Sequence, residues 1–191
     1  MSLNTPVRNW TSQRVWVVGA SSGIGLALAQ ALISLGARVA VSARRAEPLL
    51  ALASAHPQQV LALPLNMTEN ADWDSAWNNI NSAWQGADWV VFCAADYTPI
   101  RAWELNRDRA AQLIDINFTG TLRGVATVLP DFLARGSGGI AIVASVAGYM
   151  GLPKSLVYGP TQAALINFAE SLYLDVKPKG PDVRVPTPGS A

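Results

Sequence analysis

Hydrophobic residues follow two alternating patterns along this chain. Short continuous apolar runs are typical of strands buried on both faces of a sheet, whereas apolar positions that return every three or four residues are typical of helices. The predicted strands are Arg14–Val18, Arg38–Ser42, Val60–Leu65, Trp89–Cys93, Gly139–Ala144 and Val183–Val185. The predicted helices are Ile24–Leu35, Glu47–Ala55, Asn70–Trp84, Asp108–Leu133 and Tyr158–Val176.

Strands that alternate with helices predict an α/β fold. We expect a Rossmann-like, doubly wound parallel sheet with helices on both faces, in three α/β/α layers. The sequence has neither an internal repeat nor a linker, so one domain is predicted over residues 1–191. One predicted helix carries an apolar stripe that we interpret as core packing rather than as a binding surface. The stripe consists of Trp73, Trp77, Ile80 and Trp84.

A glycine-rich turn joins the first predicted strand to the first predicted helix. It has the spacing G-x-x-x-G-x-G and reads Gly19-Ala20-Ser21-Ser22-Gly23-Ile24-Gly25. Glycines let the backbone approach a phosphate closely, and the following helix presents free N–H groups and the positive end of its dipole. A turn without a ligand would not need two glycines at the helix start, where each costs about 1 kcal/mol. The turn therefore predicts a dinucleotide-binding domain.

The residues after the second predicted strand indicate which dinucleotide is bound. A free ribose 2′-hydroxyl is usually held by an acidic residue about 20 positions after the glycine loop. This chain has no acid there and instead carries Arg44 and Arg45. Because guanidinium groups match the geometry of phosphate, we favour NADP over NAD as the cofactor. The alternative is that both arginines only extend into solvent at the start of the next helix.

Composition narrows the possible partners. A net charge of +1 gives no electrostatic basis for binding nucleic acid or an anionic membrane. One cysteine cannot form an internal disulfide, and residues 1–10 lack the apolar region of a signal peptide, so we expect a cytoplasmic protein. No run is long enough for a transmembrane helix, and no cluster of ligands predicts a metal site.

Three further positions complete a recognisable pattern. Asn117 lies in the long fourth helix, Ser145 follows the fifth strand, and Tyr158 opens the last helix. With the glycine loop and the late Pro188-Gly189, they resemble the short-chain dehydrogenase/reductase family from Arg14 through Gly189. The resemblance implies hydride transfer between a nicotinamide cofactor, here NADP(H), and a small-molecule carbonyl or alcohol substrate.

The resemblance also implies roles for single residues. In the family, the tyrosine is the general acid/base, the serine hydroxyl hydrogen-bonds the substrate oxygen, and the asparagine holds a water in a proton relay. Tyr158, Ser145 and Asn117 match these positions. The cofactor-binding residues expected from the loop and the resemblance are Gly19, Ser21, Ser22, Gly23, Ile24, Gly25, Arg44, Arg45, Asn66, Ala94, Tyr158, Gln162, Pro188 and Gly189.

One position departs from the family pattern. The family has a lysine four residues after the tyrosine, which holds the nicotinamide ribose and lowers the tyrosine pKa from its free value of about 10. This chain has Gln162, which offers hydrogen bonds but no charge. We expect this fourth catalytic position to hold ribose hydroxyls, and proton transfer to be slow near neutral pH and faster at alkaline pH. Lys154 precedes the helix and would have to fold back to replace the lysine.

Other departures are milder. Cys93 and Asp96 stand where the family's turn after the fourth strand has asparagine and glycine, and we interpret Cys93 as a packing residue rather than a nucleophile. Asn66 replaces an aspartate that meets the adenine, and an amide can make similar hydrogen bonds.

The chain ends two residues after Gly189, so a substrate loop and a seventh strand have no residues to form them. We expect an incomplete sequence rather than a shortened family member, because an uncovered site would admit water.

Two functions follow from these observations. The first is an NADP-dependent oxidoreductase, with an apolar substrate wall at Met150, Leu152 and Leu156. The alternative is an NADP(H)-binding protein of the same fold without turnover, a sensor or assembly partner, which the altered residues Gln162 and Cys93 favour. A homodimer or homotetramer is expected through the two long helices. The last helix carries small and apolar residues beyond what one buried face needs, namely Ala163, Ala164, Phe168 and Leu172.

Overall fold

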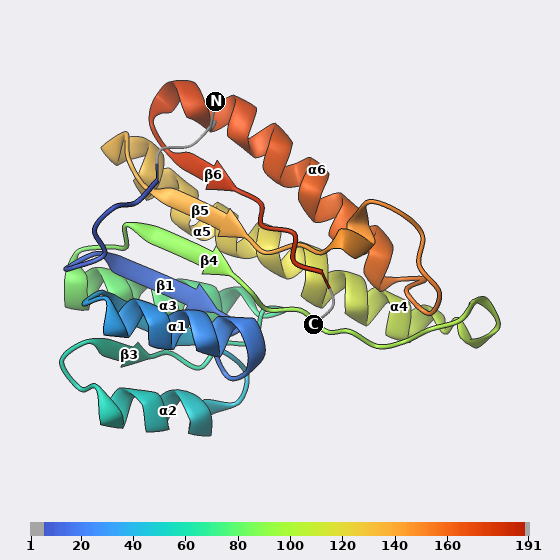
Figure 1. Ribbon diagram of the computed structural model, residues 1–191, viewed down its shortest axis with the longest axis horizontal. Coiled ribbons are helices and arrows are strands. Elements are labelled where there is room, and N and C mark those ends of the chain that lie inside the picture. Colours follow the sequence, from blue (N-terminus) through green and yellow to red (C-terminus); the bar gives the residue numbers. More distant parts are fainter. Residues whose placement is uncertain (1–5, 190–191) are drawn as a thin grey trace.

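The computed structural model describes residues 6–189 and contains one parallel sheet with the strand order β3-β2-β1-β4-β5-β6 (Figure 1). The strands are β1 (Arg14–Val18), β2 (Arg38–Ser42), β3 (Val60–Ala62), β4 (Trp89–Phe92), β5 (Gly139–Ile142) and β6 (Asp182–Arg184). The helices are α1 (Gly23–Ser34), α2 (Ala46–Ala55), α3 (Asn70–Trp84), α4 (Arg107–Ile114), α5 (Gly120–Arg135) and α6 (Tyr158–Val176). Of residues 1–10, for which no signal peptide is predicted, the first five lie outside the described range.

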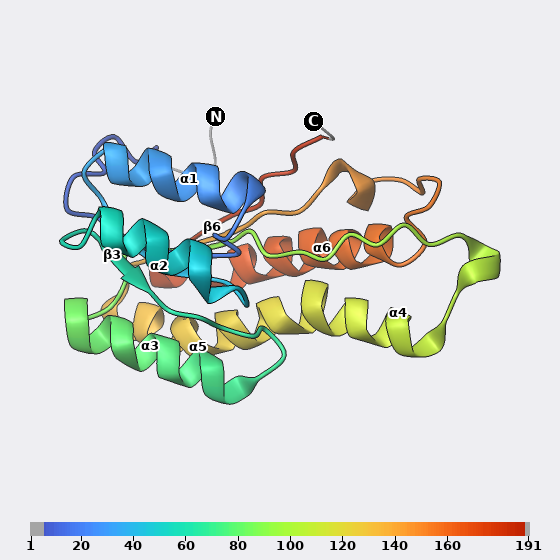
Figure 2. The ribbon, with the colours of Figure 1, turned by 90° about the horizontal axis from the view of Figure 1, so that it is seen from below.

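Helices cover both faces of the sheet, which confirms the predicted Rossmann-like fold. Figure 2 shows α1 on one side of the sheet and α3 and α5 on the other. Alternate residues of β1 serve the two cores: Val15 and Val17 pack with residues of α1 and α2, whereas Trp16 and Val18 pack with residues of α3, α5 and α6. Strands buried on both faces explain why the sequence shows continuous apolar runs instead of alternation.

The tryptophan stripe of α3 lies in the larger of these cores, as predicted. Trp73, Trp77 and Ile80 are buried, and Trp84 is half-buried against them. The ring of Trp16 stacks on Trp77 at 6.0 Å and meets Trp73 edge-on at 5.6 Å. These tryptophan side chains therefore pack α3 against the sheet and do not form a binding surface.

Two elements differ clearly from the prediction. β3 ends at Ala62 instead of Leu65, although the N–H groups of Leu63 and Leu65 still donate to the carbonyls of Val41 and Ala43. The single helix expected over residues 108–133 is interrupted by a π-helical turn, Asp115–Thr119, which separates α4 from α5. Such turns are rare and are frequent at functional sites. Asn117 is the middle residue of this turn.

The expected surplus of apolar residues on α6 and the expected lack of a transmembrane helix can each be compared with the described residues. Leu172 is buried in the core of a single chain, and Phe168 packs edge-on against Phe118 at 6.4 Å. The expectation of apolar surface beyond one buried face is therefore wrong for Leu172, whereas Ala164 and Phe168 are half-buried and Ala163 is exposed. Within residues 6–189, no helix has the length and apolar character to cross a membrane.

Candidate active site

The glycine-rich turn packs tightly against the loop that follows β4. A Cβ atom on Gly19 would lie 2.4 Å from the backbone nitrogen of Ala94, and one on Gly25 would lie 2.2 Å from the carbonyl oxygen of Gly19. Gly23 has a φ of +56° and open space around it. Close approach therefore requires glycine at positions 19 and 25, whereas the backbone conformation favours it at position 23.

The turn ends at a helix N-terminus that is open to an anion. Ser22 is the N-cap residue of α1, but its side chain makes no capping hydrogen bond, and the first turn of the helix contains no acidic residue. The first N–H groups of α1 therefore keep their partial positive charge uncompensated. Helix N-termini of this kind bind phosphate groups.

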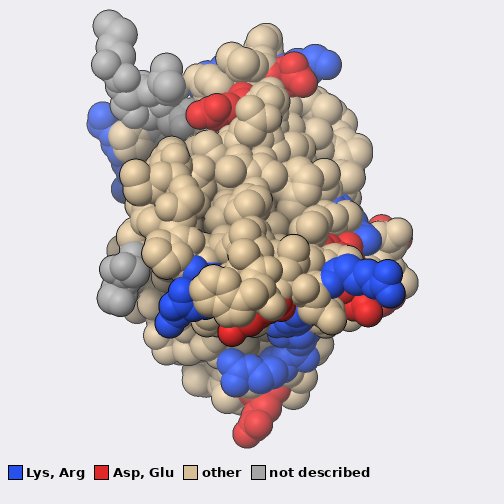
Figure 3. Space-filling model, turned by 90° about the vertical axis from the view of Figure 1, so that its right-hand side faces the viewer, with Lys and Arg blue, Asp and Glu red and all other residues tan. Residues whose placement is uncertain are grey.

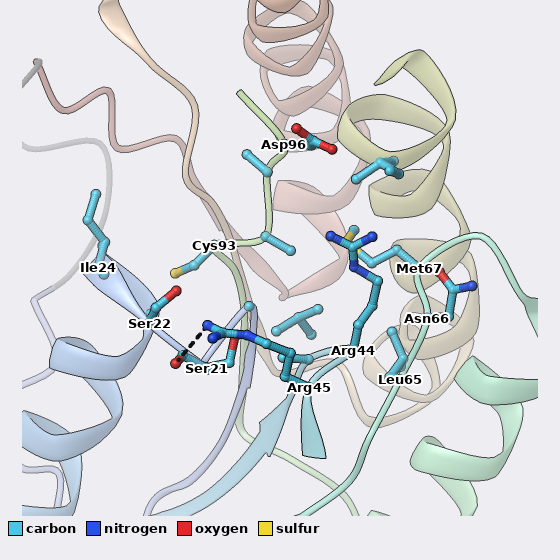
Figure 4. A pocket seen from close by; sticks show the side chains of 18 residues that line it. Ser21, Ser22, Ile24, Arg44, Arg45, Leu65, Asn66, Met67, Cys93 and Asp96 are labelled. Atoms are coloured by element: carbon cyan, nitrogen blue, oxygen red, sulfur yellow. Dashed lines mark hydrogen bonds between the residues drawn. The ribbon is translucent and has the colours of Figure 1, made fainter. Parts of the chain in front are cut away.

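A cavity of about 530 Å³ borders this turn at the carboxyl ends of the strands (Figure 4). It lies where the strand order reverses between β1 and β4, which is where open α/β sheets bind their ligands. Ten of the predicted cofactor residues line it, namely Gly19, Ser21, Ser22, Gly23, Ile24, Gly25, Arg44, Arg45, Asn66 and Ala94. The structure thus brings together residues from the ends of four strands.

Both predicted arginines reach the cavity from the segment after β2 (Figure 4). An Nη atom of Arg45 lies 3.4 Å from the carbonyl and hydroxyl oxygens of Ser21, so this side chain is held beside the glycine turn. Arg44 forms no ion pair with any described residue. The acidic lining residue, Asp96, is already paired with Arg109 at 3.1 Å. The cavity therefore presents uncompensated positive charge.

Asn117 connects the π-helical turn to the loop after β4. Its Oδ1 accepts a hydrogen bond from the Asp96 N–H at 2.7 Å, and its Nδ2 donates to the Asp96 carbonyl at 2.9 Å. The same Nδ2 lies 3.5 Å from the hydroxyl of Thr161, which donates to the carbonyl of Tyr158. The fully buried Asn117 side chain thus links three segments and fixes the start of α6.

Ser145 and Tyr158 lie at the carboxyl end of β5 and the N-terminal end of α6. Ser145 caps a short 3-10 turn, Val146–Gly148, and its Oγ accepts a hydrogen bond from the Ala147 N–H at 3.2 Å. Its own hydroxyl hydrogen is therefore available to a ligand. The 3-10 turn packs on α6, since a Cβ on Gly148 would lie 2.8 Å from the carbonyl carbon of Gln162.

Gln162 is buried one turn further along α6, with 1% of its surface exposed. Its Nε2 has no hydrogen-bond partner among the described residues. A buried donor left without a partner costs about 1–3 kcal/mol. The position therefore favours a ligand that accepts a hydrogen bond.

Four of the predicted cofactor residues do not border the cavity. They are Tyr158, Gln162, Pro188 and Gly189. The C-terminal segment nevertheless lies beside Ser145, because the Pro186 carbonyl accepts from the Ala144 N–H at 2.9 Å and the Pro188 carbonyl accepts from the Val146 N–H at 3.3 Å. A ligand that contacted the ten cavity residues and also these four residues would extend from the cavity along the ends of β4 and β5.

Cys93 lines the cavity next to the glycine turn. Burial raises the pKa of its thiol to about 11. The thiol is therefore protonated near neutral pH, and its interpretation as a packing residue agrees with the structure. Residues 6–189 contain no cluster of three or more histidine, cysteine or acidic side chains that could hold a metal ion.

Two features of the site were not predicted. Arg109 pairs with Asp96 and also donates to the Thr98 hydroxyl, which fixes the loop after β4. Tyr97 packs its ring edge-on against Tyr158, with 5.1 Å between the ring centroids. The sequence carries no signal for either contact, because the two residues of each contact are separated along the chain and meet only through the fold.

Comparison with known proteins agrees with this geometry. Residues 13–190 match the family model described as short chain dehydrogenase. An uncharacterised oxidoreductase of Listeria monocytogenes is 33% identical over 176 residues, which cover 90% of this chain and 70% of that protein. Dehydrogenase/reductase SDR family member 7 of Mus musculus is 32% identical over 173 residues, which cover 87% of this chain and 51% of that protein.

Solved structures give the same result. A short-chain dehydrogenase from Streptomyces avermitilis matches with a TM-score of 0.90 and 29% identity, covering 94% of this chain and 66% of that chain. The L-sorbose reductase from Gluconobacter frateurii, in complex with NADPH and L-sorbose, matches with a TM-score of 0.87 and 25% identity, covering 95% of this chain and 70% of that chain. This chain therefore belongs to the short-chain dehydrogenase family, a family of oxidoreductases.

Proposed function

We propose that the protein is an NADP-dependent oxidoreductase that interconverts a carbonyl compound and an alcohol. The observation that carries the proposal is the cavity at the reversal of the strand order. There the glycine turn, the open N-terminus of α1 and the two arginines face one space. An adenosine carrying a 2′-phosphate and a pyrophosphate is the ligand whose charges match this lining.

The residues present fit NADP(H). The N–H groups at the start of α1 suit the pyrophosphate, and Arg44 and Arg45 suit the 2′-phosphate. Asn66 offers an amide at the adenine end, and the unpartnered Nε2 of Gln162 suits a ribose hydroxyl at the other end. When bound, the nicotinamide supplies or accepts the hydride. The relative at 25% identity that is in complex with NADPH supports this assignment.

Tyr158 and Ser145 supply the remaining chemistry on the substrate oxygen. In the direction of reduction, the Tyr158 hydroxyl gives its proton to the carbonyl oxygen while the Ser145 hydroxyl donates a hydrogen bond to it. The contact of Ser145 with the Ala147 N–H orients its Oγ and leaves the hydrogen free. Asn117 holds the start of α6, and so Tyr158, through Thr161.

Turnover measurements on single variants test this proposal. We expect the protein to consume NADPH in the presence of ketones. Tyr158→Phe lowers kcat by at least about a hundredfold, because the general acid is lost, and weakens NADPH binding by no more than about fivefold, because the other expected cofactor contacts remain. Equal activity of the wild type and Tyr158→Phe would remove Tyr158 from the reaction. NADPH binding without turnover of any ketone would point to the non-catalytic alternative.

The proposal includes a homodimer or homotetramer that buries outward-facing residues of α5 and α6. Leu174 on α6 is 71% exposed in the single chain, which supports burial against another copy. Sedimentation at micromolar concentration tests this, and a monomer would contradict it.

The single cysteine, half-buried as a protonated thiol, supports a reducing compartment such as the cytoplasm.

A further inference from the structure

Tyr97 lies against Tyr158 but is itself 54% exposed. The two rings meet edge-on, with 5.1 Å between the centroids and 80° between the planes. An edge-on contact covers only the rim or one face of a ring, so the rest of the Tyr97 ring stays accessible. An aromatic surface is thus available directly beside the proposed acid/base.

The loop that carries Tyr97 is fixed on both sides of it. On one side, Asn117 makes two hydrogen bonds to the Asp96 backbone, and Arg109 binds the side chains of Asp96 and Thr98. On the other side, Ile100 is buried, and its N–H donates to the Lys154 carbonyl at 2.8 Å. Tyr97 is therefore held in place by its flanking residues, which lowers the cost of ordering it around a ligand.

The segment that pairs with this loop adds further apolar surface. A β-bridge joins Ile100 to Ser155, so the loop after β4 and the segment before α6 run side by side at the right of Figure 1. Position 97 and residues 149–156 contain five exposed aromatic or aliphatic side chains, with exposed fractions between 41% and 67%. They are Tyr97, Tyr149, Met150, Leu152 and Leu156.

Charged groups are scarce in the segment before α6, whereas the loop after β4 is charged from Arg101 onward, four residues beyond Tyr97. Figure 3 looks onto this end of the molecule, where an area without charged side chains occupies the middle of the visible, described part and charged side chains gather in the lower half. Asp96 and Arg109 neutralise each other, and Arg101 stacks on Trp103 at 5.3 Å. Lys154 is the one charged residue in the sequence from Ser145 to Tyr158. Beside the acid/base, the segment before α6 thus offers an apolar substrate several exposed apolar side chains and a charged one a single counter-charge.

We propose that Tyr97 is a specificity-determining residue and that the substrate is an uncharged, apolar ketone or its alcohol, whose ring or chain packs on Tyr97. The proposal rests on the proposed function, because Tyr158 places the reacting oxygen. It favours a small molecule over a protein partner, since the accessible ring lies against the acid/base and between fixed loop residues. Burial of an apolar ring or chain against Tyr97 would supply the binding energy.

Binding of a matched pair of ketones tests the proposal without turnover. The protein saturated with NADP⁺ cannot reduce a ketone, so calorimetry measures the Kd of acetophenone and of para-acetylbenzoate, which differ by one carboxylate. We expect acetophenone to bind at least about tenfold more tightly. Tyr97→Ala weakens acetophenone binding by about five- to tenfold, whereas Tyr97→Phe and Lys154→Ala leave it unchanged.

The results that would contradict this inference can be told apart from those that would contradict the proposed function. Equal or tighter binding of para-acetylbenzoate, or no effect of Tyr97→Ala, overturns the inference, as does failure of both ketones to bind while NADP⁺ does. Failure of NADP⁺ itself to bind overturns the proposed function, and this inference with it. If Tyr97→Ala changes the sedimentation of the protein instead of ketone binding, the surface is an interface between copies and not a substrate site.

Discussion

At the residue scale, the site depends on whether its polar side chains have hydrogen-bond partners within the chain. Asn117 and Ser145 have their partners within the chain, whereas Gln162 has a buried Nε2 without one. A neutral amide at this position can bind a hydroxyl but cannot stabilise a phenolate one turn away. A cation about 4 Å from the phenolate supplies about 4 kcal/mol at an effective dielectric constant of 20. The missing charge therefore has a measurable consequence for proton transfer.

Gln162→Lys is the variant that tests this consequence. We expect kcat for alcohol oxidation with NADP⁺ to rise from neutral to alkaline pH in the wild type, because this direction needs the deprotonated tyrosine. The variant should raise this kcat near neutral pH by at least about tenfold, because the new ammonium stabilises the deprotonated tyrosine. Gln162→Met is the matched control, which keeps the length of the side chain and adds no charge. A wild-type profile that is flat over this range, or an unchanged kcat in Gln162→Lys, would contradict the account.

How much of the site could be predicted differs from residue to residue. The glycine turn, Arg44 and Arg45 were predicted because their chemistry lies in local spacing, and the cavity lining confirms that they lie together. The catalytic roles of Ser145 and Tyr158 stay predictions. Tyr97 could not be found in the sequence, because an aromatic residue in a loop has no pattern until the fold places it against another ring.

At the element scale, strand and helix bounds follow local sequence wherever packing agrees with it. β1, β2, α3 and α6 begin and end as predicted. The two larger differences are β3, which ends three residues early although Leu63 and Leu65 still donate to Val41 and Ala43, and the π-helical turn around Asn117, where helix geometry adapts to tertiary contacts. The period of apolar residues does not reveal a single π-helical turn.

The turn between β1 and α1 provides a paired prediction. Gly25→Ala would bring a Cβ to 2.2 Å from the Gly19 carbonyl oxygen, so the turn must shift and we expect NADPH affinity to fall by at least about a hundredfold. Gly23→Ala meets no atom within 4 Å and strains only a φ of +56°, so it should lower stability by about 1–2 kcal/mol and largely spare the fold of the turn. Tryptophan quenching by NADPH and urea unfolding separate the two effects. Similar affinities in both variants would mean that the turn does not contact the cofactor.

At the scale of the whole molecule, the end of the sheet opposite the cavity is held by a polar cluster around Arg14. The Arg14 side chain bonds both carboxylate oxygens of Asp88 and the carbonyls of Trp84 and Gln85, and so joins β1, α3 and the start of β4. Burial acts to raise the pKa of Asp88, but the hydrogen bonds and charge of Arg14 outweigh it and hold this pKa below its ordinary value. The pair therefore stabilises the fold only while Asp88 is ionised.

Acid titration of stability tests this pair. A carboxyl with a lowered pKa in the folded state contributes stability above its unfolded pKa, near 4, and loses that contribution as the pH falls through the folded value. We expect the free energy of unfolding in urea to decline more for the wild type than for Asp88→Asn between about pH 5 and pH 2. Because both groups are partly exposed, the difference should not exceed about 1 kcal/mol. Parallel curves for the two proteins would show that Arg14 does not perturb Asp88.

The central claim is that the cavity beside the glycine turn binds NADP(H), and titration with NADPH and with NADH tests it most directly. Quenching of the tryptophan fluorescence should give a Kd for NADPH at least about tenfold below that for NADH. Arg44→Ala and Arg45→Ala should remove most of this difference and leave NADH binding unchanged. Equal affinity for the two dinucleotides, tighter binding of NADH, or no binding of either would contradict the assignment.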